Sequence, residues 1–156
     1  MLARDELAAW LRLLETPGIG RENARRLLAA FGSPEAVFEA PNDALRQVVS
    51  AAAANALAKP PAGFEALLDA TWAWATTAES TDAPGARHIL TMADAAYPRL
   101  LLQTADPPLL LYCRGRIERL RESSVAIVGS RNPTRQGADN ARAFAAHLSQ
   151  AGLTVV

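Results

Sequence analysis

The front part of the chain has the hydrophobic spacing of short amphipathic helices. Apolar residues recur every three or four positions, stop at residues 16–20, and resume at residues 23–31. This period is that of a helix with one buried face. Residues 59–63 interrupt the pattern again with two prolines and a glycine, and residues 64–78 restore it. We therefore predict a small helical domain over residues 1–80. Its first apolar stripe consists of Leu7, Trp10, Leu11 and Leu14.

Polar and small residues at the breaks indicate where these helices begin and end. Gly32 stands where a helix C-terminal cap falls, and Ser33 is expected to cap the helix that follows. Asn42 is expected to cap the next one, and the alanine-rich residues 50–58 favour a further helix.

Beyond residue 86 the pattern changes to short apolar runs, which are typical of strands. An amphipathic helix is predicted over residues 137–151, with Phe144 on its apolar face, and a short one near Tyr97. We expect a linker at residues 81–86 and a second domain over residues 87–156. The predicted strands are residues 88–92, 109–114, 125–128 and 153–156.

Composition narrows the class of protein. The 156 residues are 50% hydrophobic and 21% charged, which is typical of a folded protein and not of a disordered one. No apolar run is long enough to span a bilayer, and the first residues do not resemble a signal peptide. A single cysteine, Cys113, excludes an internal disulfide. We expect a cytoplasmic protein without a membrane contact.

The charges are unevenly placed along the chain. Residues 1–80 carry a net charge of −3 and residues 81–156 a net charge of +3, and 15 of the 16 basic residues are arginines. Arginine binds phosphate in a planar, two-pronged geometry, so the second half is compatible with an anionic ligand. GC-rich codon usage explains an arginine- and alanine-rich chain equally well.

The sharpest local signal lies at residues 125–134 (VAIVGSRNPT), a strand followed by a glycine-serine turn and then a helix. With the last predicted strand it forms a βαβ unit around a buried parallel sheet, whose ligand site lies at the carboxyl end of the first strand. Gly129 allows close backbone approach, Ser130 offers donors, and Arg131 can bind phosphate near the helix N-terminus. A plain turn, with Arg131 paired to a surface carboxylate, explains the same pattern. Neither G-x-G-x-x-G nor G-x-x-x-x-G-K-[ST] is present.

Three motifs in order carry a family resemblance. Residues 97–101 (YPRLL), 106–115 (DPPLLLYCRG) and 125–134, with Gly137 in the following helix, resemble the DprA/Smf family. The resemblance covers residues 87–156 strongly and the helical front more loosely. It implies a small SAM-like helical domain followed by a Rossmann-like domain, an α plus α/β fold.

The resemblance also implies a function. Members of the family bind single-stranded DNA and help to load the recombinase RecA onto it during natural transformation, without catalysis and without a cofactor. Carried over to this chain, Gly129 shapes the loop of the DNA pocket, Ser130 donates to a phosphate, and Arg131 supplies positive charge. The remaining expected contacts are Asn132, Thr134 and Gly137.

The chain departs from the family pattern in two places. Gln136 stands where many members have a tyrosine, which argues against base stacking at this position. The sequence stops at Val156, so we expect the Rossmann-like domain to be truncated, with the RecA contact in the missing part. An unpaired strand edge at residues 153–156 predicts a homodimer.

A second motif lies in the helical front. Residues 14–28 resemble a helix-hairpin-helix element, in which Gly18 and Gly20 expose backbone N–H groups to a phosphate, with Arg21 and Arg25 nearby. A tight turn between two helices explains the glycines equally well. Because the first half is acidic, we favour a structural or protein-contact role.

The remaining residues suggest no catalysis and no metal site. His88 and His147 lie far apart without a ligand cluster, and Cys113 is expected to be packed. Trp72 is expected in the core, and Trp74 at the seam between the domains. Two alternatives stay open: a Rossmann-like enzyme acting on a nucleotide or sugar phosphate, and a protein-interaction module without DNA activity.

Overall fold

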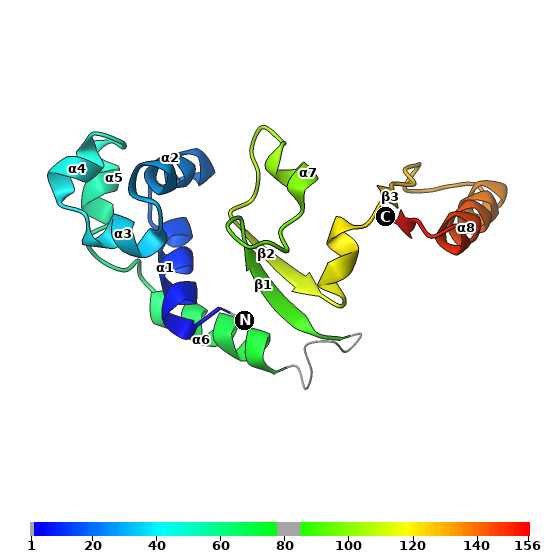
Figure 1. Ribbon diagram of the computed structural model, residues 1–156, viewed down its shortest axis with the longest axis horizontal. Helices are drawn as coiled ribbons and strands as arrows, with labels where there is room; N and C mark the ends of the chain where they lie inside the picture. Colours follow the sequence, from blue (N-terminus) through cyan, green and yellow to red (C-terminus); the bar gives the residue numbers. More distant parts are fainter. Residues whose placement is uncertain (1, 78–84) are drawn as a thin grey trace. The chain divides into compact units, whose positions relative to one another are not determined.

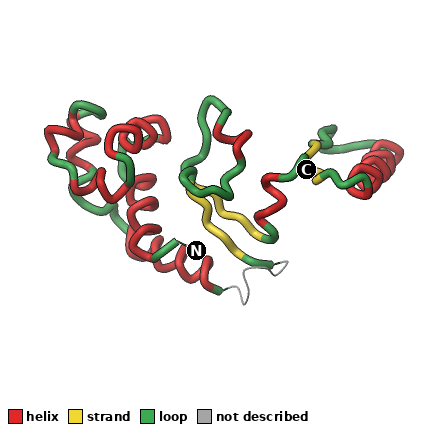
Figure 2. Tube along the Cα trace, in the orientation of Figure 1, coloured by secondary structure: helices red, strands yellow, loops and turns green. Residues whose placement is uncertain are grey.

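The computed structural model describes residues 2–77 and 85–156. Its contacts form two units, of which the first ends at Arg116 and the second runs from Ile117 to Val156. Seven helices, α1 to α7, and a two-stranded hairpin make up the first unit, and a small β-α-β unit makes up most of the second (Figures 1 and 2). None of the described helices has the length and apolar character needed to cross a membrane.

The predicted helical front is confirmed over residues 2–77. Its helices are α1 (Arg4–Glu15), α2 (Arg21–Phe31), α3 (Pro34–Glu39), α4 (Asn42–Arg46), α5 (Ala51–Ala56) and α6 (Phe64–Thr76). Gly32 ends α2 with φ +90°, a conformation that favours glycine, and its N–H donates to the Leu28 carbonyl at 2.8 Å. Ser33 caps α3 as predicted, since its Oγ accepts from the Ala36 N–H at 3.2 Å. Ser50 caps α5 in the same way.

The prediction that Asn42 caps α4 is wrong. Pro41 occupies the cap position, and Asn42 is the first residue inside the helix. Its side-chain amide donates instead to Oδ1 of Asn55 at 3.3 Å. Proline has a fixed φ near −65° that suits the approach to a helix, so the chain enters α4 without a side-chain cap.

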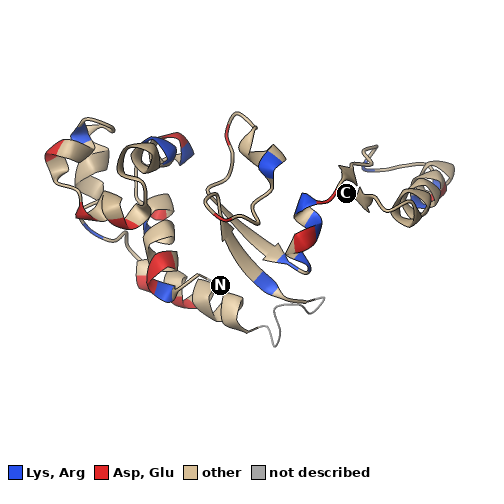
Figure 3. Cartoon of the chain, in the orientation of Figure 1, with Lys and Arg blue, Asp and Glu red and all other residues tan. Residues whose placement is uncertain are grey.

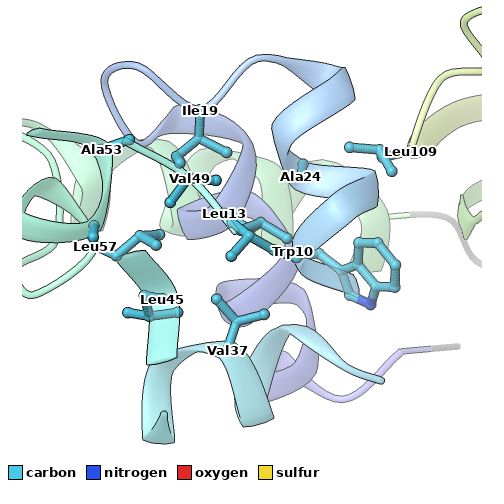
Figure 4. Packing of buried hydrophobic residues seen from close by; sticks show 12 residues of the cluster. Trp10, Leu13, Ile19, Ala24, Val37, Leu45, Val49, Ala53, Leu57 and Leu109 are labelled. Carbon is cyan, nitrogen blue, oxygen red and sulfur yellow. The ribbon is translucent and has the colours of Figure 1, made fainter. Parts of the chain in front are cut away.

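The main core lies between α1, α2, α3 and the segment from α4 to α5 (Figure 4). Leu13, Leu27 and Val37 are completely buried, and Trp10 is 4% exposed. Removing such a leucine side chain typically costs about 2–5 kcal/mol of stability. A second cluster joins Leu7 and Leu11 of α1 to Phe64 and Leu68 of α6, and Trp72 packs against it as predicted.

Strands β1 (Arg87–Thr91) and β2 (Leu110–Arg114) form an antiparallel hairpin that belongs to the first unit. Leu109, one residue before β2, is 1% exposed and packs within the helical core. The predicted linker at residues 81–86 falls mostly outside the described residues, so the division there stays a prediction. The contacts nevertheless group this hairpin with the helices and not with the second unit.

Tyr97 anchors the connection between the two strands, which contains the short helix α7 (Arg99–Leu102) expected near this residue. Tyr97 is 1% exposed, and its hydroxyl donates to the Pro108 carbonyl at 2.6 Å. Asp94 accepts hydrogen bonds from the backbone N–H and the hydroxyl of Thr91, at 2.6 and 2.9 Å. These bonds satisfy polar groups that the hairpin end buries.

The second unit contains the 3-10 helix η1 (Ile117–Arg121), strand β3 (Ser124–Val125), helix α8 (Arg135–Gln150) and strand β4 (Thr154–Val155). The two strands pair in parallel, Ser124 with Thr154 and Val125 with Val155. Backbone bonds extend the pairing to Ile127, whose N–H donates to the Val156 carbonyl at 2.8 Å. The predicted strand–helix–strand order is confirmed, with shorter strands than expected.

The expectation of a sheet buried on both faces is wrong for the described residues. Val125 and Ile127 are half-buried, whereas Ala126 and Val128 between and after them are exposed. Phe144 was predicted on the packed face of α8 but is 64% exposed. The half-buried residues of α8 are Ala138, Ala141, Ala145 and Leu148. Each strand pairs on one side only within the described residues, and a homodimer through an open edge stays a prediction.

Replacing Tyr97 by phenylalanine tests the anchor. Burial raises the pKa of the Tyr97 phenol above its ordinary value of 10.0, so the unfolded chain ionises first and the folded chain loses stability as the pH rises beyond that value. We expect Tyr97→Phe to lower the free energy of unfolding by about 1 kcal/mol at neutral pH and to weaken this alkaline loss. Urea unfolding followed by circular dichroism, at neutral pH and at about pH 11, measures both effects.

Tyr112→Phe is the control, because the Tyr112 ring is half-exposed and its hydroxyl forms no hydrogen bond with the described residues. A Tyr97→Phe variant as stable as the wild type would show that the bond to Pro108 contributes nothing.

Candidate nucleic-acid interface

The loop at residues 128–134 leaves β3 and enters the N-terminus of α8. Because β3 and β4 are parallel and pair up to Ile127 and Val156, the loop emerges at the carboxyl edge of this sheet. That edge is where open parallel sheets place ligands. Gly129, Ser130 and Arg131 therefore lie at this edge of the sheet.

Gly129 and Ser130 give this loop its local geometry. Gly129 does not have a positive φ, and a Cβ atom built on it would meet nothing within 4 Å. The fold itself therefore does not require glycine here, and the open space is available to a ligand. Ser130 Oγ accepts from the Asn132 N–H at 3.2 Å, which leaves the hydroxyl proton to donate elsewhere.

Thr134 caps α8 and sets the direction of its first turn. Its Oγ1 accepts from the Gly137 N–H at 3.1 Å. A Cβ atom at Gly137 would lie 3.2 Å from this oxygen, so glycine leaves room for the cap. The N–H groups of Arg135 and Gln136 have no acceptor among the described residues, and they add partial positive charge at this end of the helix.

The arginines near the loop lack acidic partners in the described part of the chain. Arg131 and Arg135 are exposed and form no ion pair there. Arg142, farther along α8, pairs with Asp139 at 2.9 Å, and Arg119 pairs with Glu122 at 2.6 Å. Residues 117–156 carry five arginines and three acidic residues, and Figure 3 shows their distribution. Uncompensated positive charge therefore gathers at the loop and the start of α8.

The second candidate, the turn between α1 and α2, is tightly packed. Gly18 has φ +80°, and a Cβ atom there would lie 3.8 Å from the Cβ of Ala53 in α5. Ile19 is buried in the core, and Gly20 is the N-cap residue of α2 without a side-chain cap. The glycine at position 18 thus serves the turn itself.

Arg21 and Arg25, predicted beside this turn, share one carboxylate. Asp106 accepts from Arg21 at 2.5 Å and from Arg25 at 2.6 Å, one oxygen for each arginine. Arg25 also donates to the Pro107 carbonyl at 3.2 Å. Asp106 was not predicted from the sequence as a partner of these arginines. The four-residue spacing of the arginines places both on one side of α2, but their partner lies 81 positions beyond Arg25.

The remaining predicted candidates stay separate. The described residues contain no group of three His, Cys, Asp or Glu side chains that could hold a metal ion. Cys113 lies in β2, and burial raises the pKa of its thiol, which disfavours the reactive thiolate. His88 stands opposite Cys113 in the hairpin, whereas His147 lies in α8.

Comparison with known proteins identifies the family. Residues 88–156 match the family model of DNA recombination-mediator protein A, and residues 4–62 match that of a DprA-like N-terminal HHH domain. The chain belongs to the DprA/Smf family. The second match assigns the α1–α2 hairpin to a helix-hairpin-helix domain, as the spacing of residues 14–28 suggested.

Two curated relatives, each called Protein Smf, are similar to part of the chain. That of Synechocystis sp. is 42% identical over 72 residues, which are 43% of this chain and 18% of the relative. That of Borreliella burgdorferi is 29% identical over 68 residues, which are 44% of this chain and 22% of the relative. The matched parts thus span about a fifth of the DprA/Smf proteins compared.

A double-mutant cycle tests the shared carboxylate. Because the Arg25 side chain is only 22% exposed and makes a second bond to Pro107, we expect Arg25→Ala and Asp106→Asn to couple by about 0.5–1 kcal/mol in urea unfolding. The pair Arg4 and Asp69, at 2.6 Å but more exposed, is the control and should couple more weakly. Equal coupling in both pairs would contradict a special role for Asp106.

Removing the cap of α8 tests the local order of the candidate interface. Thr134→Ala leaves the Gly137 N–H without its acceptor, and a lost cap costs about 1 kcal/mol of helix stability. We expect faster hydrogen exchange at residues 137–138, measured by mass spectrometry, while Thr134→Ser, which keeps the hydroxyl, restores the slow exchange. Unchanged exchange in Thr134→Ala would show that the cap does not order this turn.

Proposed function

We propose that the chain binds single-stranded DNA through its backbone phosphates, at the loop that joins β3 to α8. The observation that carries this proposal is that several hydrogen-bond donors without acceptors lie close together in the sequence. Arg131, Arg135 and the first N–H groups of α8 lack acidic partners in the described part of the chain and belong to one short stretch. A phosphate accepts from all three kinds of group.

The loop suits a ligand that approaches closely. Gly129 has open space where a side chain would be, and the Ser130 hydroxyl keeps a proton to donate. Asn132, Thr134 and Gly137 shape the path of the chain into α8, through the Ser130–Asn132 bond and the Thr134–Gly137 cap. In this proposal Arg131 carries most of the charge, and Gly129 keeps the approach open.

Phosphate contacts position a strand without reading its sequence. Binding at this loop should therefore tolerate any base sequence. It should also weaken as the salt concentration rises, because arginine displaces cations from the strand and their release is less favourable at high salt. Gln136 has no aromatic ring for stacking, so the loop by itself gives no preference for exposed bases.

We also propose a role in DNA recombination. Family membership and the description of the matching family support it. RecA loading during natural transformation, in the cytoplasm and without catalysis, belongs to the same proposal and rests on the family resemblance alone. The structure adds no observation that favours an enzyme acting on a nucleotide or sugar phosphate.

Charge removal at the loop tests the proposal. We expect Arg131→Ala to weaken the binding of a labelled oligo-dT about tenfold or more, since a charged hydrogen bond contributes at least 1.5 kcal/mol or so. The slope of log affinity against log salt should fall by about 0.7, the value for one phosphate contact on a single strand. Fluorescence anisotropy at several salt concentrations measures both quantities, with Gly129→Ala as a second variant expected to weaken binding by crowding.

Arg142→Ala is the matched control, because it removes the same charge from the same unit at a residue that already pairs with Asp139. Equal losses of affinity in the two arginine variants would show that the effect comes from the net charge of the protein and not from a contact at the loop. Preference for duplex over single-stranded DNA would contradict the proposal outright.

A further inference from the structure

Aromatic and arginine side chains from three elements meet where β1 begins and β2 ends. The rings of Trp74 in α6 and Tyr112 in β2 lie 5.4 Å apart, centroid to centroid, at an interplanar angle of 70°. The guanidinium carbon of Arg87 in β1 lies 5.5 Å from the centre of the Trp74 ring. Arg87 also donates to the Trp74 carbonyl at 3.2 Å, near the C-terminus of α6.

This meeting point is open to solvent. A shallow hollow of about 400 Å³ is lined by Ala70, Thr71, Trp74 and Tyr112. Tyr112 is 52% exposed although it lies in a paired strand. An edge-to-face contact uses only one edge or one face of the Tyr112 ring, so this half-exposed ring has a face left for another planar group.

Among the described residues, the charges at this end of the hairpin are mainly positive. Arg87 and Arg114 stand directly opposite each other in the hairpin, and like charges in that position destabilise a strand pair. Neither forms an ion pair with the described residues, and Arg116 follows two positions later without one. The two hairpin strands carry basic residues and no acidic ones (Figure 3). An anion held near Arg87 and Arg114 would relieve their repulsion.

Tyr112 and Arg114 also share one side of β2. Side chains two positions apart in a strand point to the same face, and both residues are exposed while Cys113 between them is half-buried. A planar group against the Tyr112 ring therefore lies one strand repeat, about 7 Å, from the base of the Arg114 side chain. That separation suits a base and its own phosphate within one nucleotide.

We propose that Trp74, Arg87, Tyr112 and Arg114 form an aromatic–arginine platform that binds single-stranded nucleic acid by base stacking. A base lies against the exposed ring of Tyr112, and the neighbouring phosphate binds Arg114 and the edge of Arg87. The platform extends the proposed function, on which it rests for the class of ligand, by adding a second contact in the first unit. It supplies what the β3–α8 loop lacks, an aromatic surface for bases.

Hairpin packing alone explains the contact between Trp74 and Tyr112. It does not explain why two arginines face each other there without an ion pair to any described carboxylate, or why the Tyr112 ring stays half-exposed. A stacked nucleotide accounts for both features, because the base covers the ring and the phosphate neutralises the arginines.

The test uses the full chain and two oligonucleotides of equal length, oligo-dT and a strand in which every sugar is abasic. Both carry the same phosphates, so the ratio of their affinities reports base contacts alone. We expect the wild type to prefer oligo-dT by roughly fivefold or more, the effect of one stacked base. Tyr112→Leu, which keeps apolar cover for α6, should lose that preference, and Tyr112→Phe should keep it.

Two further arms separate this inference from the proposed function. Arg131→Ala should weaken both strands equally and leave the ratio unchanged, whereas Phe144→Ala, which removes an exposed ring in the other unit, should change nothing. Loss of binding in Arg131→Ala with an unchanged ratio in Tyr112→Leu would overturn the platform alone. Equal affinity of the wild type for both strands would also overturn it, and no binding to either strand would overturn both proposals.

Discussion

The first unit depends on four consecutive residues between the hairpin strands, Asp106 to Leu109, whose carboxylate and last three carbonyls all accept hydrogen bonds. Asp106 holds two arginines of α2, and the Pro107 carbonyl accepts from one of them. The Pro108 carbonyl accepts from the Tyr97 hydroxyl, and the Leu109 carbonyl accepts from the Met92 N–H at 2.9 Å. The two prolines have no N–H to satisfy, so packing them beside the helices buries no backbone donor of their own. Leu109 then places its side chain in the helical core.

The second unit is organised differently. Its strands are short, its helix covers one face, and α8 contains no fully buried residue. Its local order comes from hydrogen bonds close in sequence, the Ser130–Asn132 turn and the Thr134 cap. These bonds arrange the polar groups of the loop without depending on a large core, and they leave Arg131 and Arg135 exposed for a partner.

Features set by neighbouring residues could be predicted from the sequence. The glycine at position 32, the Ser33 cap and the strand–turn–helix order around Gly129 all follow from local backbone chemistry. The prediction for Asn42 was wrong because Pro41 occupies the cap position and the Asn42 side chain binds Asn55 instead. The role of Asp106 could not be predicted from the sequence, because this carboxylate and α2 come together only in the folded unit. The prediction for Phe144 was wrong because helical spacing shows which residues share a face of the helix. It does not show how much of that face the neighbouring strands cover.

The anchored stretch also constrains the exposed face of β2. A strand alternates its side chains with a period of two, so removing or adding one residue between Leu109 and Tyr112 would turn every later side chain to the opposite face. Leu109 is fixed by the core and cannot slide to compensate. Such an indel would turn Tyr112 and Arg114 away from Trp74 and bring Cys113 round in their place, although composition and charge would barely change. The spacing between a buried leucine and an exposed tyrosine is thus a length constraint, and alignments of related chains should show fewer gaps there than in the loop that follows β3.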